Sequence, residues 1–160
     1  MTDHVDRKLA ELGLSLPEAV APIASYVPLV QVGNLIHVSG QLPFKDGQVV
    51  TGRLGDGVSV EQGQEAAQLC ALMIVAQLKK HLGDLSRVTQ VVKLGVFVNS
   101  HGDFTDQPQV GNGASDLMMA LFGDAGKHAR AAVGVPALPR GAAVEVDAIV
   151  AVADAIPDPN

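Results

Sequence analysis

The stretch of sequence that decides the fold is Val144-Glu145-Val146-Asp147-Ala148-Ile149-Val150-Ala151-Val152. Side chains alternate along a strand, so the even-numbered residues share one apolar face, and Glu145 and Asp147 share the other. Burying a carboxylate is costly unless it is paired, so these two acids mark a candidate functional site. Arg130, about fifteen residues upstream, is the companion we expect, because an arginine can hold a carboxylate through two parallel hydrogen bonds.

Outward from this strand, hydrophobic periodicity and turn residues predict an α+β fold. A capping box at Ser59-Val60-Glu61-Gln62 opens a helix that Gly83 stops. A second helix is expected over residues 114–122, after a loop over 102–113. Strands are expected over residues 26–30, 35–39, 48–50, 88–99, 133–136 and 142–152. Each helix falls between strands, which favours a single sheet with two helices on one face. The other face is then either solvated or an oligomer interface.

The ends of the chain are predicted to lie outside this domain. Residues 1–20 contain a short amphipathic helix that ends at Gly13 and form an N-terminal helical extension. The domain itself is expected over residues 21–153. Residues 154–160, which include Pro157 and Pro159, are expected to form a tail.

Composition excludes several classes of partner. The chain has 160 residues, a formal net charge of −6 and only 11 Lys plus Arg with no basic cluster, so nucleic acid is not expected as a partner. No apolar run reaches the roughly 18–20 residues of a membrane span, so no membrane partner is expected. The charged N-terminus leads into no apolar segment, which argues against a signal peptide and favours a cytoplasmic location.

Isolated reactive residues give weaker signals. The single cysteine, Cys70, lies on the apolar stripe of the first long helix, which predicts a buried and inert thiol. The five histidines lack metal-ligand spacing, so no metal site is expected. The segment Lys127-His128-Ala129-Arg130 fits a site, but spacing alone favours a solvated turn.

Three segments together carry a resemblance to a known family. These are residues 26–43 with Val38-Ser39-Gly40-Gln41-Leu42-Pro43, the strand over 92–98, and Ala129-Arg130-Ala131-Ala132-Val133 followed by Leu138-Pro139 and Val144-Glu145-Val146-Asp147. In this order they resemble the Rid (reactive intermediate deaminase) family, formerly called YjgF-like and often labelled endoribonuclease L-PSP. The resemblance covers about residues 22–152.

The resemblance implies a chorismate-mutase-like fold that assembles as a homotrimeric barrel with clefts between subunits. Active members hydrolyse 2-imino acids and their enamine tautomers to 2-keto acids and ammonia, without cofactor or metal. By motif, Arg130 matches the arginine that binds the carboxylate of a small metabolite, and Glu145 matches the acid that handles water. Ala132 falls where a backbone carbonyl helps to hold that water. The remaining substrate-binding positions are Tyr26, Ser39 and Gly40.

Departures from the family pattern leave other functions open. The Asn-x-x-Tyr motif of the family maps onto Ser115 and Met118, and the N-terminal helix is extra, which indicates a divergent branch. The alternative to a deaminase is a non-catalytic trimer that binds small metabolites or serves a regulatory role. A ribonuclease is suggested only by the family label, and the acidic net charge argues against it.

Overall fold

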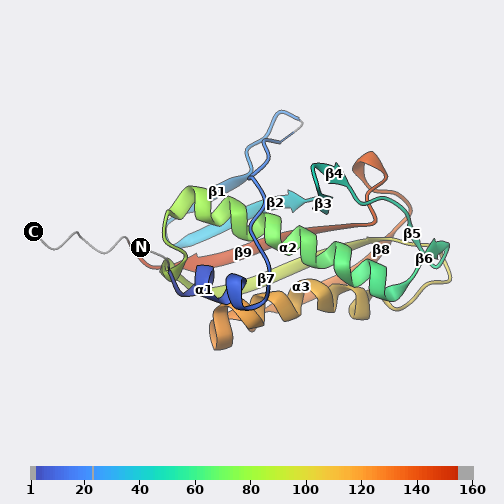
Figure 1. Ribbon diagram of the computed structural model, residues 1–160. Helices are drawn as coiled ribbons and strands as arrows, with labels where there is room; N and C mark the ends of the chain where they lie inside the picture. The colour runs from blue at the N-terminus through green and yellow to red at the C-terminus, as the bar shows by residue number, and fades with distance from the viewer. Residues whose placement is uncertain (1–2, 23, 155–160) are drawn as a thin grey trace, which may run out of the picture.

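The computed structural model describes residues 3–22 and 24–154, which form a five-stranded mixed sheet covered on one face by helices, with two small two-stranded sheets beside it (Figure 1). The expected α+β class is confirmed. All of the predicted tail except Asp154 lies outside the described residues, as do Met1 and Thr2 of the N-terminal extension. The elements in chain order are α1 (His4–Glu11), β1 (Leu29–Val32), β2 (Leu35–Gln41), β3 (Phe44–Lys45), β4 (Gln48–Val49), β5 (Arg53–Leu54), β6 (Gly57–Val58), α2 (Val60–Leu82), β7 (Val88–Asn99), α3 (Gln107–Phe122), β8 (Ala129–Val135) and β9 (Val144–Val152).

The main sheet has five strands in the order β1-β2-β9-β7-β8. β7 and β8 run parallel, and the other neighbours are antiparallel. β9 therefore lies at the centre, and β1 and β8 form the two edges. Helices α2 and α3 pack side by side over the same face (Figure 1), as the sequence predicted.

The helix-covered face of the sheet forms the core. On β9 the even-numbered residues from Val144 to Val152 are buried, and the odd-numbered residues are only partly buried, which confirms the predicted alternation. The capping box of α2 is present, with Ser59 Oγ accepting from the Gln62 amide and Gln62 Oε1 accepting from the Ser59 amide. Cys70 is fully buried on α2, also as predicted.

The N-terminal helix is tied to the rest of the molecule. Val5 and Leu9 are 2% and 4% exposed and belong to the core. Asp3 caps α1, accepts from the Leu85 amide and pairs with Lys79 of α2 at 2.9 Å. α1 is thus held by both apolar burial and charge, and the chain after it crosses α2 before entering β1 (Figure 1).

Several predicted boundaries were wrong, each for a physical reason. β1 begins at Leu29 and not at Tyr26, because Pro28 has no N–H to contribute to the ladder. Strict alternation on β7 fails because the register shifts near Gln90 and again near Val92, which leaves Val92 exposed and Val91 buried. β8 spans Ala129–Val135, so Arg130 lies on a strand and not in a turn.

The expected loop over 102–113 was also partly wrong, since α3 begins at Gln107. Its glycines obscured the helical pattern, yet one of them permits close packing. A Cβ on Gly113 would lie 2.0 Å from the Gln64 carbonyl oxygen of α2, so the two helices can approach only with glycine there. Tertiary packing overrides the low helix propensity of glycine at this position.

None of the helices within residues 3–22 and 24–154 combines the length and apolar character that a bilayer crossing requires.

Candidate functional site

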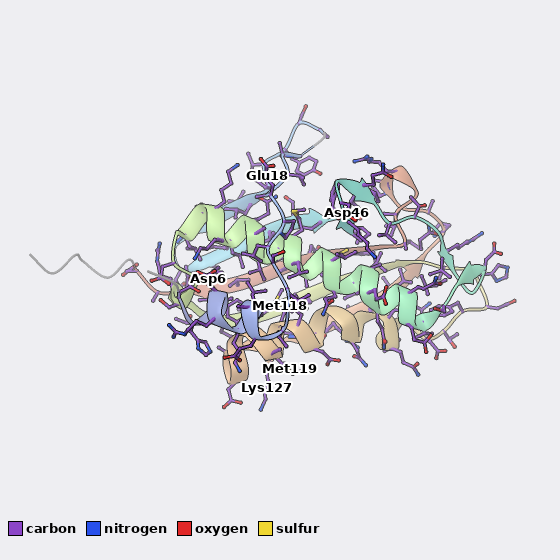
Figure 2. All side chains as sticks on the ribbon, in the orientation of Figure 1. Asp6, Glu18, Asp46, Met118, Met119 and Lys127 are labelled. Atoms are coloured by element: carbon purple, nitrogen blue, oxygen red, sulfur yellow. The ribbon has the colours of Figure 1, made fainter. Side chains whose placement is uncertain are left out.

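Glu145 lines a cavity on the face of the sheet that no helix covers. The cavity encloses about 220 Å³ and lies between the N-terminal segment, β2, β3 and the start of β9. In Figure 2, Glu18 marks the N-terminal segment that borders the cavity, and Asp46 marks the turn between β3 and β4. Most of the lining is apolar, from Val20, Ala21, Pro22, Ala24, Pro28, Leu42 and Phe44. Glu145 is therefore a carboxylate at an apolar wall, half-buried and without a hydrogen bond to any described side chain.

Gly40 makes room for this carboxylate. A Cβ at position 40 would lie 2.4 Å from Glu145 Oε1 and 2.9 Å from its carboxyl carbon. The pairing of β2 with β9 is irregular between Val38 and Gln41, which brings the Gly40 backbone toward the acid. The structure thus brings together two of the predicted site residues, and glycine is required at one of them.

Burial raises the pKa of the Glu145 carboxyl above its ordinary value, and the negative charge of nearby Asp147 raises it further. Burial also raises the pKa of Asp147, although a hydrogen bond from the Gly95 amide and the charge of Lys93 oppose that rise. A carboxyl that releases its proton closer to neutral pH is suited to proton transfer. Glu145 therefore has the electrostatic setting of a general acid–base.

Of the predicted positions Tyr26 and Ser39, Tyr26 lines the same cavity, whereas Ser39 lies immediately before the lining residue Gly40 in the chain. Tyr26 is 50% exposed. The Ser39 hydroxyl donates to the Val27 carbonyl at 2.8 Å, and the Pro28 carbonyl accepts from the Ser39 amide at 2.9 Å. Ser39 therefore fixes the segment that carries Tyr26, and its hydroxyl is already engaged.

Arg140 is a residue of this cavity that the sequence analysis missed. It lines the cavity in a left-handed backbone conformation (φ 58°), with its guanidinium carbon 5.7 Å from the centre of the Phe44 ring. The sequence showed only a turn at Leu138-Pro139-Arg140-Gly141. A cation at the rim favours anionic ligands in an otherwise apolar cavity.

Arg130 lies elsewhere, on edge strand β8 against α3. Its Nη1 donates to Asn112 Oδ1 at 2.9 Å and to Ser115 Oγ at 3.0 Å, and its Nη2 donates to the Pro108 carbonyl at 3.1 Å. Arginine has five N–H groups, so two remain for a ligand carboxylate. A Cβ on Gly111 would lie 3.2 Å from Arg130 Nη1, so glycine leaves space for the guanidinium.

Ser115, which accepts a hydrogen bond from Arg130, is itself held by His128. Ser115 is 6% exposed, and its hydroxyl also lies 2.8 Å from His128 Nε2. His128 Nδ1 lies 2.6 Å from the Gly126 carbonyl, which places the ring proton on Nδ1 and leaves Nε2 to accept from Ser115. From the sequence, Ser115 stood out only as a departure from a family motif. Asn112 was detectable only from its i,i+3 spacing to Ser115, once the helix was known to begin at Gln107.

Arg130 and Glu145, expected to be companions, lie on opposite faces of the sheet within one chain. Arg130 of β8 pairs with Leu94 of β7, and Leu94 in turn pairs with Ala148 of β9. Arg130 therefore shares the helix-covered face with Ala148, whereas Glu145 has the opposite parity on β9 and lies on the other face. Ala132, two residues after Arg130, shares the helix-covered face. The predicted site is divided into a Glu145 half and an Arg130 half.

The family model described as "YjgF/chorismate mutase-like, putative endoribonuclease" matches residues 6–151. This protein belongs to that family. Protein TCP17 of Trypanosoma cruzi is 55% identical over 92% of this chain and 93% of its own. A 2-iminobutanoate/2-iminopropanoate deaminase of Dermatophagoides farinae is 30% identical over 87% of this chain and 94% of its own. The crystal structure of protein Atu1372 of Agrobacterium tumefaciens, described as having unknown function, superposes with a TM-score of 0.90. It is 49% identical and covers 95% of this chain and 94% of its own.

The relatives that this chain resembles include proteins named 2-iminobutanoate/2-iminopropanoate deaminase. The match of the family model confirms the resemblance seen in the sequence. The 55% identity to TCP17, against 30% to the mite deaminase, fits the expected divergent branch.

Proposed function

We propose that this protein hydrolyses 2-imino acids and their enamine tautomers to 2-keto acids and ammonia. The observation that carries the proposal is Glu145, a half-buried carboxyl with a raised pKa at the wall of a cavity large enough for a small metabolite. Relatives named 2-iminobutanoate/2-iminopropanoate deaminase support this reaction class.

The reaction requires one positioned water and one group that moves a proton. Glu145 accepts a proton from water as the water oxygen attacks the carbon of the protonated imine, and a neutral carbinolamine forms. Glu145 then gives that proton to the amino nitrogen, the C–N bond breaks and ammonia leaves. Glu145 takes up the hydroxyl proton as the keto group forms, and ammonia carries this proton away as ammonium. One water is consumed for each imine, so atoms and charge balance.

Arg130 supplies substrate binding through the two N–H groups that the protein leaves unpaired. A carboxylate held there would be fixed in orientation, because the guanidinium is itself held by three hydrogen bonds. The 2-imino acid would thus be bound at one end by Arg130 and attacked at the other end near Glu145.

Joining the two halves requires a second copy of the chain. We infer a homotrimer in which edge strand β8 of one subunit faces the Glu145 cavity of the next. One edge of β8 has no partner strand. Val133 lies on the uncovered face of β8 and is 46% exposed. It pairs with Phe97 of β7, which in turn pairs with Glu145 of β9. Arg130 and Ala132 would then come from one subunit, and Tyr26, Ser39, Gly40 and Glu145 from its neighbour.

Ammonia and keto-acid release provides the direct test, with imino acids generated in situ by an amino-acid oxidase. Co-expression of Arg130→Ala and Glu145→Gln chains tests the division between subunits. Random assembly should restore about a quarter of the sites, because each site then draws its two residues from different chains. If mixing restores nothing, Arg130 and Glu145 do not form a shared site between subunits. If the wild type binds 2-keto acids and hydrolyses no imine, the non-catalytic alternative is correct.

A further inference from the structure

A second hollow lies at the far end of the sheet from α1, where β5, the end of β7, the start of α3 and the end of β8 meet (Figure 1). It encloses about 330 Å³. Its polar and flanking residues include Arg53, Ser100, His101, Phe104, Gln107 and Gly134. No aspartate or glutamate in the described part of the chain lines it, so its polar character comes from Arg53 and from side chains such as the Ser100 hydroxyl and the Gln107 amide.

Arg53 is the main unexplained feature of this hollow. Its side chain is partly buried, and Nε is fully buried without a hydrogen-bond partner. Among residues 3–22 and 24–154, no carboxylate forms an ion pair with it. A buried N–H of a guanidinium without an acceptor carries a full desolvation cost, so such groups are normally paired. The rest of the guanidinium is only partly buried and lines the hollow, so its positive charge is left for an anion that the described chain does not supply.

Ser100 provides a second donor without a partner. It is 6% exposed, and its hydroxyl makes no hydrogen bond to a described residue. Gly134 on β8 keeps the space beside it open, since a Cβ there would lie 2.5 Å from Ser100 Oγ and 2.8 Å from Gln107 Nε2. The side chains of Ser100 and Gln107 therefore converge beside Gly134, where any residue larger than glycine would intrude.

The start of α3 adds a positive end to the same hollow. Gln107 is the first residue of this sixteen-residue helix, and the preceding Asp106 makes no side-chain capping bond. Pro108, the second residue of α3, has no N–H, so the remaining amides at the helix start and the helix dipole are what favour an anion nearby. Two exposed acids flank the hollow without lining it: Asp106 at the N-cap of α3, and Asp103, whose carboxylate lies 3.8 Å from His101 Nδ1.

We propose that this hollow binds a small oxyanion, and that the anion is a phosphate group of a metabolite. Arg53, Ser100 and the start of α3 belong to three separate elements. Donors spread in this way suit the several oxygens of a phosphate better than the two coplanar oxygens of a carboxylate. The site is separate from the cavity of Glu145 and does not depend on imine hydrolysis.

Calorimetric titration of the full-length protein with inorganic phosphate, at constant ionic strength in a phosphate-free buffer, tests the proposal. Wild type should give saturable binding, and Arg53→Gln should weaken it by about ten-fold or more through loss of a charge-assisted contact. Ser100→Ala should also weaken it, and this small change leaves the packing of the strand intact. Acetate, titrated in the same way, should bind more weakly than phosphate.

Lys127→Gln is the matched control, because it also removes one positive charge. Lys127 is an exposed residue that follows α3 at the opposite end from the hollow (Figure 2). It should bind phosphate as the wild type does. The proposal is overturned if wild type shows no saturable phosphate binding, if Lys127→Gln loses as much affinity as Arg53→Gln, or if acetate binds as tightly. It is also overturned if Arg53→Gln lowers the assembled mass in light scattering and leaves phosphate affinity unchanged, because Arg53 would then pair with a neighbouring chain.

Discussion

Glu145 and Arg130 come from neighbouring segments of sequence, yet the protein holds them in opposite ways. Glu145 lies in an apolar cavity, makes no hydrogen bond to a described residue and has a raised pKa. Arg130 is held by three hydrogen bonds against α3. A group that must exchange a proton benefits from poor solvation, whereas a group that must hold a carboxylate benefits from a fixed orientation. The difference suggests that the two halves will fail in different ways when mutated.

The largest effect is expected for Glu145→Gln, with kcat lower by about 10²- to 10⁴-fold, the usual contribution of a positioned acid–base. An amide can still hydrogen-bond water but cannot accept its proton. Affinity for a 2-keto acid, measured by calorimetry, should stay close to that of wild type. A folded variant with unchanged turnover would remove Glu145 from the mechanism.

Arg130→Ala should lower kcat/KM by about 30- to 1,000-fold, which corresponds to roughly 2–4 kcal/mol for a charge-assisted bidentate contact. In contrast to Glu145→Gln, it should also abolish keto-acid binding. Arg130→Lys should recover little, because an ammonium lacks the planar fork. Wild-type rates in folded Arg130→Ala protein would show that the carboxylate is held elsewhere, with Arg140 as the next candidate.

The same contrast shows how far the sequence could lead. The alternation on β9 and the capping box of α2 depend on local pattern, and both were predicted correctly. Which face of the sheet Arg130 and Glu145 occupy depends on the register in which β8 and β9 each pair with β7. A local sequence pattern does not reveal that register. The sequence therefore identified both residues as candidates but could not show that one chain keeps them apart.

The contacts that hold Arg130 were missed for a related reason. Asn112 and Ser115 lie on a helix whose first turns include Gly111 and Gly113, and glycine normally argues against a helix. These glycines serve the approach of Arg130 and of α2, which are both distant in sequence. Arg140 at the cavity rim was similarly hidden, because its role depends on the fold of the turn around it.

Asn112→Ala tests whether the fixed orientation of Arg130 matters. It removes one of three hydrogen bonds to the guanidinium, and a bond to a charged group typically contributes about 1.5–3 kcal/mol. Asn112 is a positioning residue, so we expect kcat/KM to fall by about ten-fold, mainly through KM. Met119→Ala, an exposed position on the same helix, is the control and should change neither constant. Equal kinetics in both variants would mean that Arg130 needs no support from Asn112.

Cys70→Ala probes the face of β9 opposite to Glu145. The thiol is fully buried 3.5 Å from the Val144 carbonyl, and burial raises its pKa well above the ordinary value. We expect a loss of about 1–2 kcal/mol in the free energy of unfolding, from packing alone. Activity should be unchanged, and the native thiol should resist labelling. Rapid labelling, or lost activity in a folded variant, would show that this side of the strand reaches the site.

The smallest expected effect concerns the pH dependence set by Asp147. Glu145 must be ionised to accept a proton from water, so kcat should fall as pH drops through the pKa of Glu145. Because the charge of Asp147 raises that pKa, Asp147→Asn should move the acid limb of the kcat profile to lower pH. An unmoved limb would mean that the charge of Asp147 does not reach Glu145 in the assembled protein.

The free energy of unfolding should also depend on pH through the ionisation of Glu145. A pKa raised by folding means that the folded state binds the Glu145 proton more tightly than the unfolded state does. This contribution to stability is full below the ordinary carboxyl pKa and is lost as pH rises through the raised value. Glu145→Gln should therefore gain unfolding free energy relative to wild type at neutral pH and lose that advantage in acid, as measured by denaturant unfolding across the range. A pH-independent difference would show that Glu145 is solvated in the working assembly, and the contrast with Arg130 would then rest on binding geometry alone.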